Sequence, residues 1–184
     1  NDTGGSALHL KRGAKLSLRK ADQNSFAYLS RSSSALQRFR LIYVDASQGS
    51  GDVPVLLMYK IHIKGGSLDS PSVGGAGILV RGGVVKLDDC KITGNAITTA
   101  GSGGGMTIWG INSVVEMMRN TEISGNSAPV GSSSGVHLQI DQTSGGSVPE
   151  TTFHVDLCEM PSSNDVVSDN SPLQPCTGSS SSDW

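Results

Sequence analysis

The sequence predicts an all-β protein, a right-handed parallel β-helix, or solenoid, of about six coils. Three observations support this prediction. A cassette of glycine and aliphatic residues recurs about every 30 residues, and the segments between its glycines are short and rich in β-branched residues. A third is the near absence of helical periodicity. The alternative is a β-sandwich or jelly roll, although such folds require no motif at this period.

The clearest repeat has two copies. One copy runs from the Gly-Gly-Ala-Gly start at Gly74 to an Ile-Thr-Gly-Asn segment at Ile92, and the other runs from Gly-Gly-Gly at Gly103 to Ile-Ser-Gly-Asn at Ile123. The two starts are 29 residues apart, and the two isoleucines are 31 residues apart. Two residues are therefore expected to be inserted between these landmarks, in the turn-like segment 109–113.

Echoes of the cassette extend the array in both directions. Residues 59–66 line up with residues 88–95 at an offset of 29, and Gly5 recurs as Gly74, 69 residues later. One helical turn could form at residues 35–41, and longer helices are not expected. Short strands are expected in chain order at residues 15–18, 39–44, 60–63, 84–87, 114–117 and 153–157.

Equivalent residues of stacked coils form rows along a solenoid, because neighbouring coils lie about 4.8 Å apart. Ile63, Ile92 and Ile123 hold the same place before a glycine-containing corner, and we expect them to form one row in the core. The glycines that precede Asn95 and Asn126 accept left-handed backbone geometry. These two asparagines are expected to stack in a corner row whose amides bond along the solenoid.

With these residues in view, the pattern resembles the right-handed parallel β-helix repeats of secreted and surface proteins, including autotransporter-like and polymorphic-membrane-protein-like repeats. Those repeats likewise alternate a Gly-Gly-aliphatic segment with an aliphatic-x-x-Asn segment. The resemblance is best over residues 74–128 and weak over residues 23–55. It implies an extracellular or cell-surface setting and a role in adhesion, scaffolding or carbohydrate contact, since one fold hosts many functions.

Length and composition fit one domain. In the chain of 184 residues, we expect the parallel β-helix to cover residues 1–160 and a loop-rich, serine-rich segment to follow at 161–184. With 16% charged residues and a net charge of −2, the chain lacks the concentrated positive field that nucleic acid requires. One basic cluster is expected to be a solvated face, with an acidic glycan as the alternative ligand: Lys11, Arg12, Lys15, Arg19 and Lys20.

Other sequence features bear on location and processing. The longest apolar run, residues 53–59, contains a proline and is too short to cross a bilayer, so no membrane span is expected. The sequence starts without methionine or an apolar leader, which predicts a processed product or an excerpt of a longer polypeptide. Asn1-Asp2-Thr3 is an acceptor for N-glycosylation, which predicts a glycan on Asn1.

The three cysteines divide into a pair and a single residue. Cys158 and Cys176 bracket a loop-rich segment, where a disulfide would restrain a stretch with little core of its own. Cys90 lies two residues before Ile92, so the period of a strand places it in the core. Zinc is disfavoured because the cysteines lack short ligand spacing and the histidines fall in separate strands, at His9, His62, His137 and His154.

No catalytic signature appears, and we expect neither a metal nor a cofactor. Asp88-Asp89 is the only adjacent acidic pair, and we expect both residues to be solvated or to lie in a turn. Polysaccharide lyases and glycosidases of this fold need clustered or paired carboxylates, so such an enzyme is the alternative class. Trp109 is either an exposed platform for a glycan or a cover for the end of a coil.

These observations favour a non-enzymatic extracellular or cell-surface module with a structural or adhesive role. The alternative is a carbohydrate-binding or polysaccharide-degrading domain. A solenoid leaves an open strand edge at each end, and such edges pair with other chains unless they are capped. We therefore expect this chain to contact neighbouring domains or copies of itself, as a segment of a larger assembly or filament.

Overall fold

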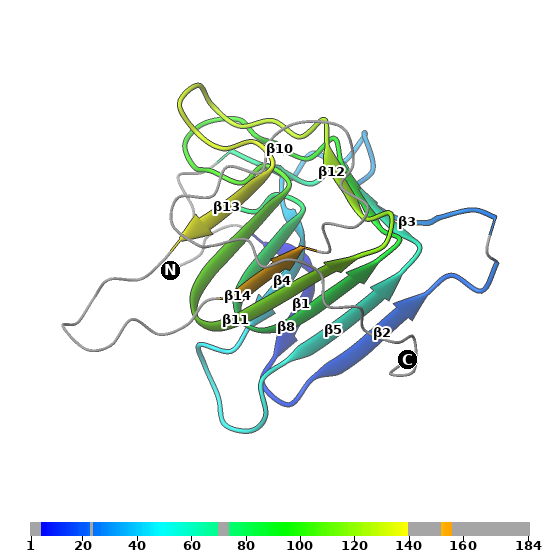
Figure 1. Ribbon diagram of the computed structural model, residues 1–184. Helices are drawn as coiled ribbons and strands as arrows, with labels where there is room; N and C mark the ends of the chain where they lie inside the picture. Colours follow the sequence, from blue (N-terminus) through cyan, green and yellow to red (C-terminus); the bar gives the residue numbers. More distant parts are fainter. Residues whose placement is uncertain (1–4, 23, 70–73, 140–151, 156–184) are drawn as a thin grey trace.

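The computed structural model describes residues 5–22, 24–69, 74–139 and 152–155, and it is a parallel β-solenoid of about 4 turns (Figure 1). In this part of the chain there is no helix, so the expected helical turn at residues 35–41 is wrong; residues 35–39 form a loop that leads into a strand. In chain order the strands are β1 (Ser6–Lys11), β2 (Lys15–Arg19), β3 (Ala27–Ser30), β4 (Arg40–Asp45), β5 (Val55–Tyr59), β6 (Ile61–Lys64), β7 (Ser67–Leu68), β8 (Ile78–Asp88), β9 (Lys91–Thr93), β10 (Ala96–Ile97), β11 (Met106–Met118), β12 (Glu122–Ser124), β13 (Val136–Gln139) and β14 (Thr152–Val155).

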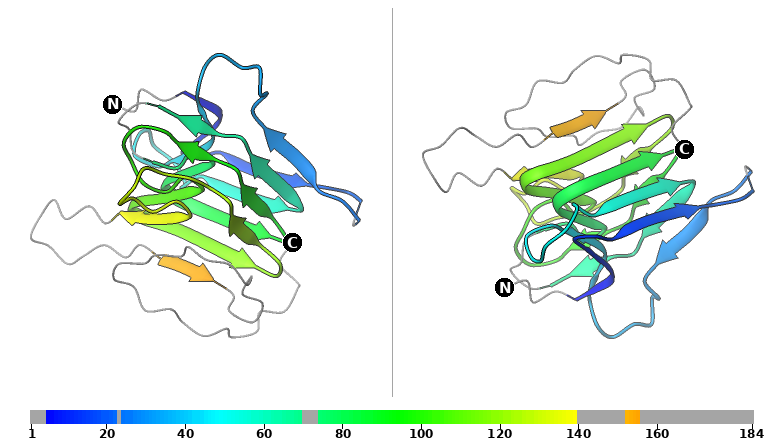
Figure 2. Two further views of the ribbon diagram at one scale, coloured as in Figure 1. Left: turned by 90° about the horizontal axis from the view of Figure 1, so that it is seen from above. Right: turned by 90° about the horizontal axis from the view of Figure 1, so that it is seen from below.

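All named strand pairs are parallel, and they form the walls of the solenoid. The largest sheet has the order β1-β4-β8-β11-β13, and it also includes β2, β5 and β14 because the long strands β8 and β11 continue around a corner. A second wall has the order β12-β9-β6-β3, and β7 pairs with β10 in a short third sheet. Figure 1 shows β2, β5, β8 and β11 side by side, and Figure 2 shows the same stack from above and from below.

The described residues form about 4 turns rather than the expected six, and the early coils among them are longer than the repeat. Ser6 pairs with Arg40 and Ile42 with Ile78, which are separations of 34 and 36 residues. The extra residues lie in corner loops such as residues 46–54, which separate β4 from β5. A period of about 30 describes the pairing of β5 with β8, of β6 with β9 and of β8 with β11, whereas the pairs of the first coil are farther apart in the sequence.

Rows of equivalent residues form the core, as the repeat predicts. Ile63 pairs with Ile92, and Ile92 pairs with Ile123; the first two are fully buried and the third is 9% exposed. Leu29 on β3 extends this row to the first coil, where it is half-buried. Burying an aliphatic side chain of this size contributes about 1.5–3 kcal/mol. Each row is therefore a main source of the free energy that holds neighbouring coils together.

The predicted insertion lies where the sequence places it. Trp109 pairs with Arg81 and Ser113 pairs with Gly83, so three residues of β11 face the single residue Gly82. Gly110 and Asn112 both have positive φ angles, of 84° and 61°, which lets the extra residues bulge out of the wall. The bulge re-aims the backbone next to Trp109, and this corner becomes part of the site described below.

Candidate functional site

Asn95 and Asn126 form the corner row expected from the Gly-Asn repeat. Gly94 and Gly125 adopt the left-handed conformation, with φ angles of 62° and 58°. The fully buried Asn95 accepts a hydrogen bond from the amide of Gly66 at 2.9 Å, and its Nδ2 donates to Oδ1 of Asn126 at 2.9 Å. The row ties three coils together through side-chain amides, so its role is structural.

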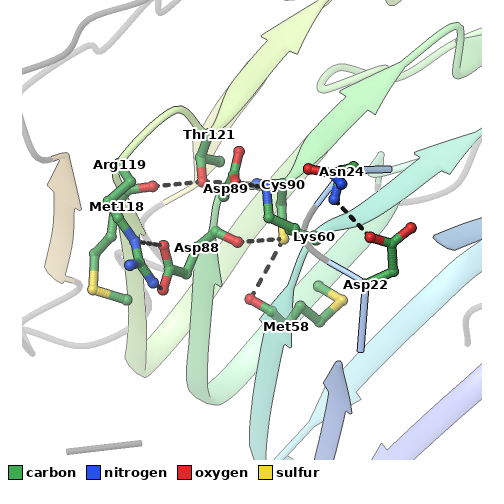
Figure 3. Close-up of polar contacts among 10 residues, drawn as sticks. All are labelled: Asp22, Asn24, Met58, Lys60, Asp88, Asp89, Cys90, Met118, Arg119 and Thr121. Carbon is green, nitrogen blue, oxygen red and sulfur yellow. Dashed lines mark hydrogen bonds and ion pairs between the residues drawn. The ribbon is translucent and has the colours of Figure 1, made fainter. Parts of the chain in front are cut away.

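The acidic pair Asp88-Asp89 lies at a different corner, shown in Figure 3. Lys60, Asp89 and Arg119 have positive φ angles of 56°, 50° and 49°, and each turns its coil between two walls. Asp88, the last residue of β8, is 1% exposed and forms an ion pair with Arg119. Asp89 forms an ion pair with Lys60. The two carboxylates therefore contact different cations rather than a shared substrate space.

These positions correct the expectation that both acids are solvated or lie in a turn. Asp89 does lie in the turn, but Asp88 is buried because Arg119 of the next coil covers it. The hydrogen bond and charge of Asp89 raise the pKa of Lys60 above its ordinary value, against the opposing effect of desolvation. The corner is an ionic clamp between coils, with each charge matched by its neighbour.

Cys90 follows the clamp and lies in the core, where the sequence predicts it. Its side chain is fully buried, and the thiol lies 3.4 Å from the carbonyl oxygen of Met58 and 3.3 Å from that of Asp88. Burial raises the pKa of the Cys90 thiol to about 12, because the core cannot solvate a thiolate. A thiol that stays protonated is a poor nucleophile.

We expect native protein treated with iodoacetamide at pH 8 to leave Cys90 unmodified, and denatured protein to be modified there, as read by peptide mass spectrometry. Because the folded pKa is raised, the contribution of this thiol to stability is complete below pH 9 and is lost as the pH rises towards 12. A Ser17→Cys variant, exposed on β2, provides the reactive control. Alkylation of native Cys90 at the rate of that control would contradict the buried assignment.

A solvent-accessible cleft lies at the corner between the two parts of the large sheet. A cleft of about 280 Å³ is lined there by residues of four successive coils, among them Arg12, Ser47, Val53, Arg81, Trp109 and Asn112. The loop between β4 and β5, cyan in Figure 1, projects beside this corner. Residues about 100 positions apart in the chain thus meet because their coils stack.

Two arginines, Arg12 and Arg81, give the cleft a positive charge. Nε of Arg12 donates to the carbonyl oxygen of Ala46 at 2.8 Å, and Nη1 donates to that of Gly51 at 3.0 Å. The guanidinium of Arg81 lies over the indole of Trp109, 4.3 Å from the ring centroid. At this distance the cation and the aromatic face attract each other. Both arginines are therefore held in place before any ligand arrives.

Trp109 itself is half-buried in β11 rather than fully exposed. Its Nε1 is buried and has no hydrogen-bond partner among the described residues. An unpaired indole donor is uncommon, because a buried polar group without a partner costs roughly 1–3 kcal/mol. Trp109 lines the cleft and lies under Arg81, in a strand that pairs with β8 on one side and β13 on the other.

One carboxylate lies beside the cleft. Asp45 pairs in register with Arg81 and accepts a hydrogen bond from the amide of Ser47 at 2.9 Å. Burial works to raise the pKa of Asp45, but the hydrogen bonds from Ser47 and the charge of Arg81 hold it below its ordinary value. Asp45 thus stays ionised and is already engaged by the loop that follows β4.

Several sequence-based predictions concern residues that the structure does not describe. Asn1, the Cys158–Cys176 pair and the segment 161–184 lie outside the described residues. Within the described residues no three histidine, cysteine or acidic side chains gather in a way that could hold a metal ion. No helix in that part of the chain is long and apolar enough to cross a bilayer.

The fold and these contacts define the class of the molecule, a parallel β-solenoid with two ion pairs at one corner and a cleft lined by two arginines and a tryptophan at another. Comparisons with protein-family models, with curated proteins and with solved structures found no match to this chain.

Proposed function

We propose that this chain is a non-enzymatic, extracellular or cell-surface β-solenoid module with a structural and adhesive role. It joins neighbouring domains or copies of itself through its ends. The likeness of its repeat to the autotransporter-like and polymorphic-membrane-protein-like repeats supports the setting. The ionic clamp supports the non-enzymatic part of the proposal, because Asp88 and Asp89 contact separate cations and do not form an acid pair.

The open face of the first coil carries the structural part of the proposal. Among the described residues, β1, β2 and β3 each pair with a strand on one side only. Their inward side chains, such as Leu8, Leu16 and Leu29, are half-buried, whereas Leu56 and Ile63 of the next coil are fully buried. A further parallel coil laid on this face would complete both the backbone hydrogen bonds and the burial.

Charge favours one orientation of such a contact. The first coil carries exposed cations on its outer walls, at Lys11, Lys15 and Arg19. Two first coils brought face to face would place these like charges together, which is unfavourable. Head-to-tail stacking avoids this repulsion and continues the parallel direction of every wall. Repetition of that contact produces a filament.

We expect the isolated chain to associate with increasing concentration, and a Ser17→Pro variant to associate far less, as measured by light scattering. The carbonyl of Ala14 and the amide of Lys20 bond to β5, so alternation points the amide of Ser17 to the free edge. Proline there removes a donor that only a new strand would use. Ser17→Ala keeps the amide and is the matched control. A monodisperse monomer at every concentration would refute the assembly.

A further inference from the structure

We propose that the cleft between Arg12, Arg81 and Trp109 binds a sugar unit that carries a carboxylate or sulfate group, so that the ligand is an acidic saccharide. This inference rests on the adhesive part of the proposed function and gives it a site and a ligand class. The cleft draws its lining from four coils, and only the stacked fold brings these residues together.

The charge of the cleft is positive. None of its lining residues is acidic. Arg12 donates to main-chain carbonyls, which leave its charge in place. Two acids lie near the cleft: Asp45, which accepts from Ser47 and also interacts with the charge of Arg81, and the exposed Asp52, whose carboxylate lies 3.9 Å from Nζ of Lys15. An anion that enters the cleft therefore meets two guanidinium groups in the lining against one carboxylate, Asp45, beside it, so the cleft keeps an excess of positive charge.

The geometry favours a planar or tetrahedral oxyanion over a point charge. A guanidinium group presents a fixed fork of donors that matches a carboxylate or sulfate through two parallel hydrogen bonds. Stacking on Trp109 fixes the plane of the Arg81 fork, and the loop carbonyls fix Arg12. Because these side chains are ordered in advance, binding costs little conformational entropy.

The rest of the lining fits the sugar ring that carries the anion. Trp109 and Val53 provide apolar surface, and the exposed side chains of Ser47 and Asn112 can donate to or accept from hydroxyl groups. A volume of about 280 Å³ exceeds what a bare anion fills and lies near the lower end for small organic ligands. The combination fits one or two monosaccharide units with an acidic substituent.

The test is a fluorescence titration in a Trp184→Phe background, which leaves Trp109 as the one indole of the two in the sequence. The probes are digalacturonate, a heparin-derived disaccharide, neutral cellobiose and inorganic sulfate. We expect at least one acidic disaccharide to bind, and Arg81→Gln and Arg12→Gln to weaken that binding at least tenfold. Arg81→Lys, which keeps the charge but loses the fork, should fall in between.

Arg19→Gln is the matched control, because Arg19 also lies over an aromatic ring, 5.7 Å from the centroid of Tyr59, but outside the cleft. Circular dichroism confirms the fold of each variant. An equal loss in Arg19→Gln would show unspecific attraction and overturn the site. Equally tight binding of cellobiose or inorganic sulfate, or no binding of either acidic disaccharide, would also overturn it.

The outcomes separate this inference from the function on which it rests. A chain that assembles through its ends but binds no acidic disaccharide refutes the cleft alone. A monomer that binds digalacturonate refutes the assembly alone. Release of shorter products from digalacturonate or a longer polygalacturonate would support the cleft as a saccharide site and refute the non-enzymatic role.

Discussion

Replacing Ile92 by aspartate is expected to unfold the solenoid. Ile92 is fully buried between Ile63 and Ile123, and the part of the structure that is described offers no cation within this row of aliphatic side chains. An unpaired carboxylate in such a place costs several kcal/mol, and a domain of this kind has a total stability of only about 5–15 kcal/mol. One buried carboxylate in this row can therefore remove most of the stability of the solenoid.

Two control variants separate the effect of introducing a carboxylate from the effect of changing the buried position. Ile92→Val removes one methylene group and should cost about 0.5–1.5 kcal/mol. Ser30→Asp places a carboxylate next to Leu29 of the same row, but on the exposed side of β3, and should change little. Urea denaturation followed by circular dichroism measures all three variants. If Ile92→Asp unfolds at the same urea concentration as the parent chain, the core row is wrongly assigned.

The rows near Ile92 could be predicted because both spacing and residue type repeat there. The offsets of 29 and 31 that align Ile63, Ile92 and Ile123 are the separations seen in the paired strands. The register at the start of the cassette was wrong by one residue. Ile78 pairs with Met106, so Gly75 rather than Gly74 is the counterpart of Gly103. A slip of one residue exchanges the two faces of a strand.

The glycine run allows this one-residue error in the alignment, because consecutive glycines align equally well in either register. What fixes the register is the placing of the aliphatic side chains: Ile78 and Val80 stack on Met106 and Ile108, and all four are fully buried. Gly74 has its own constraint, since a Cβ atom there would lie 1.4 Å from the carbonyl oxygen of Ser102. Glycine at this position reflects crowding between loops and not the repeat.

The candidate cleft was only partly visible in the sequence. Arg12 stood in a basic cluster and Trp109 in a turn, but nothing local indicates that Arg81 lies over the indole. That contact depends on the register of β8 with β11, which pairs Arg81 with Trp109. The burial of Asp88 was missed for a similar reason, because Arg119 reaches it from the next coil. Contacts between coils follow from the three-dimensional stacking.

The corner row offers the second test with a large effect, at Asn95. Its Oδ1 accepts from the amide of Gly66, while its Nδ2 donates to the carbonyl of Ile63 and to Oδ1 of Asn126, at 3.3 and 2.9 Å. The side chain thus needs an acceptor on one side and a donor on the other. Among side chains of this size, the amide of asparagine supplies both at neutral pH.

Asn95→Asp should therefore be destabilised at pH 7 by about 3 kcal/mol, since an ionised carboxylate would face acceptor oxygens. Protonation restores a donor, so the pKa of the new carboxyl is raised in the folded state. The loss in free energy of unfolding relative to the parent chain is then smallest below about pH 4, the pKa of the carboxyl in the unfolded chain. It grows as the pH rises through the pKa of the carboxyl in the folded chain. Urea denaturation of both proteins at pH 4 and pH 7 measures this change.

Asn95→Ala and Asn120→Asp are the two control variants for this prediction. The alanine variant loses the donor and the acceptor together and should be destabilised to the same extent at both pH values, because nothing new titrates. Asn120 lies exposed in the turn before β12, so its replacement should have little effect at either pH. A deficit for Asn95→Asp that is equal at pH 4 and pH 7 would mean that the side chain is solvated. The amide row would then not be what holds the corners of neighbouring coils together.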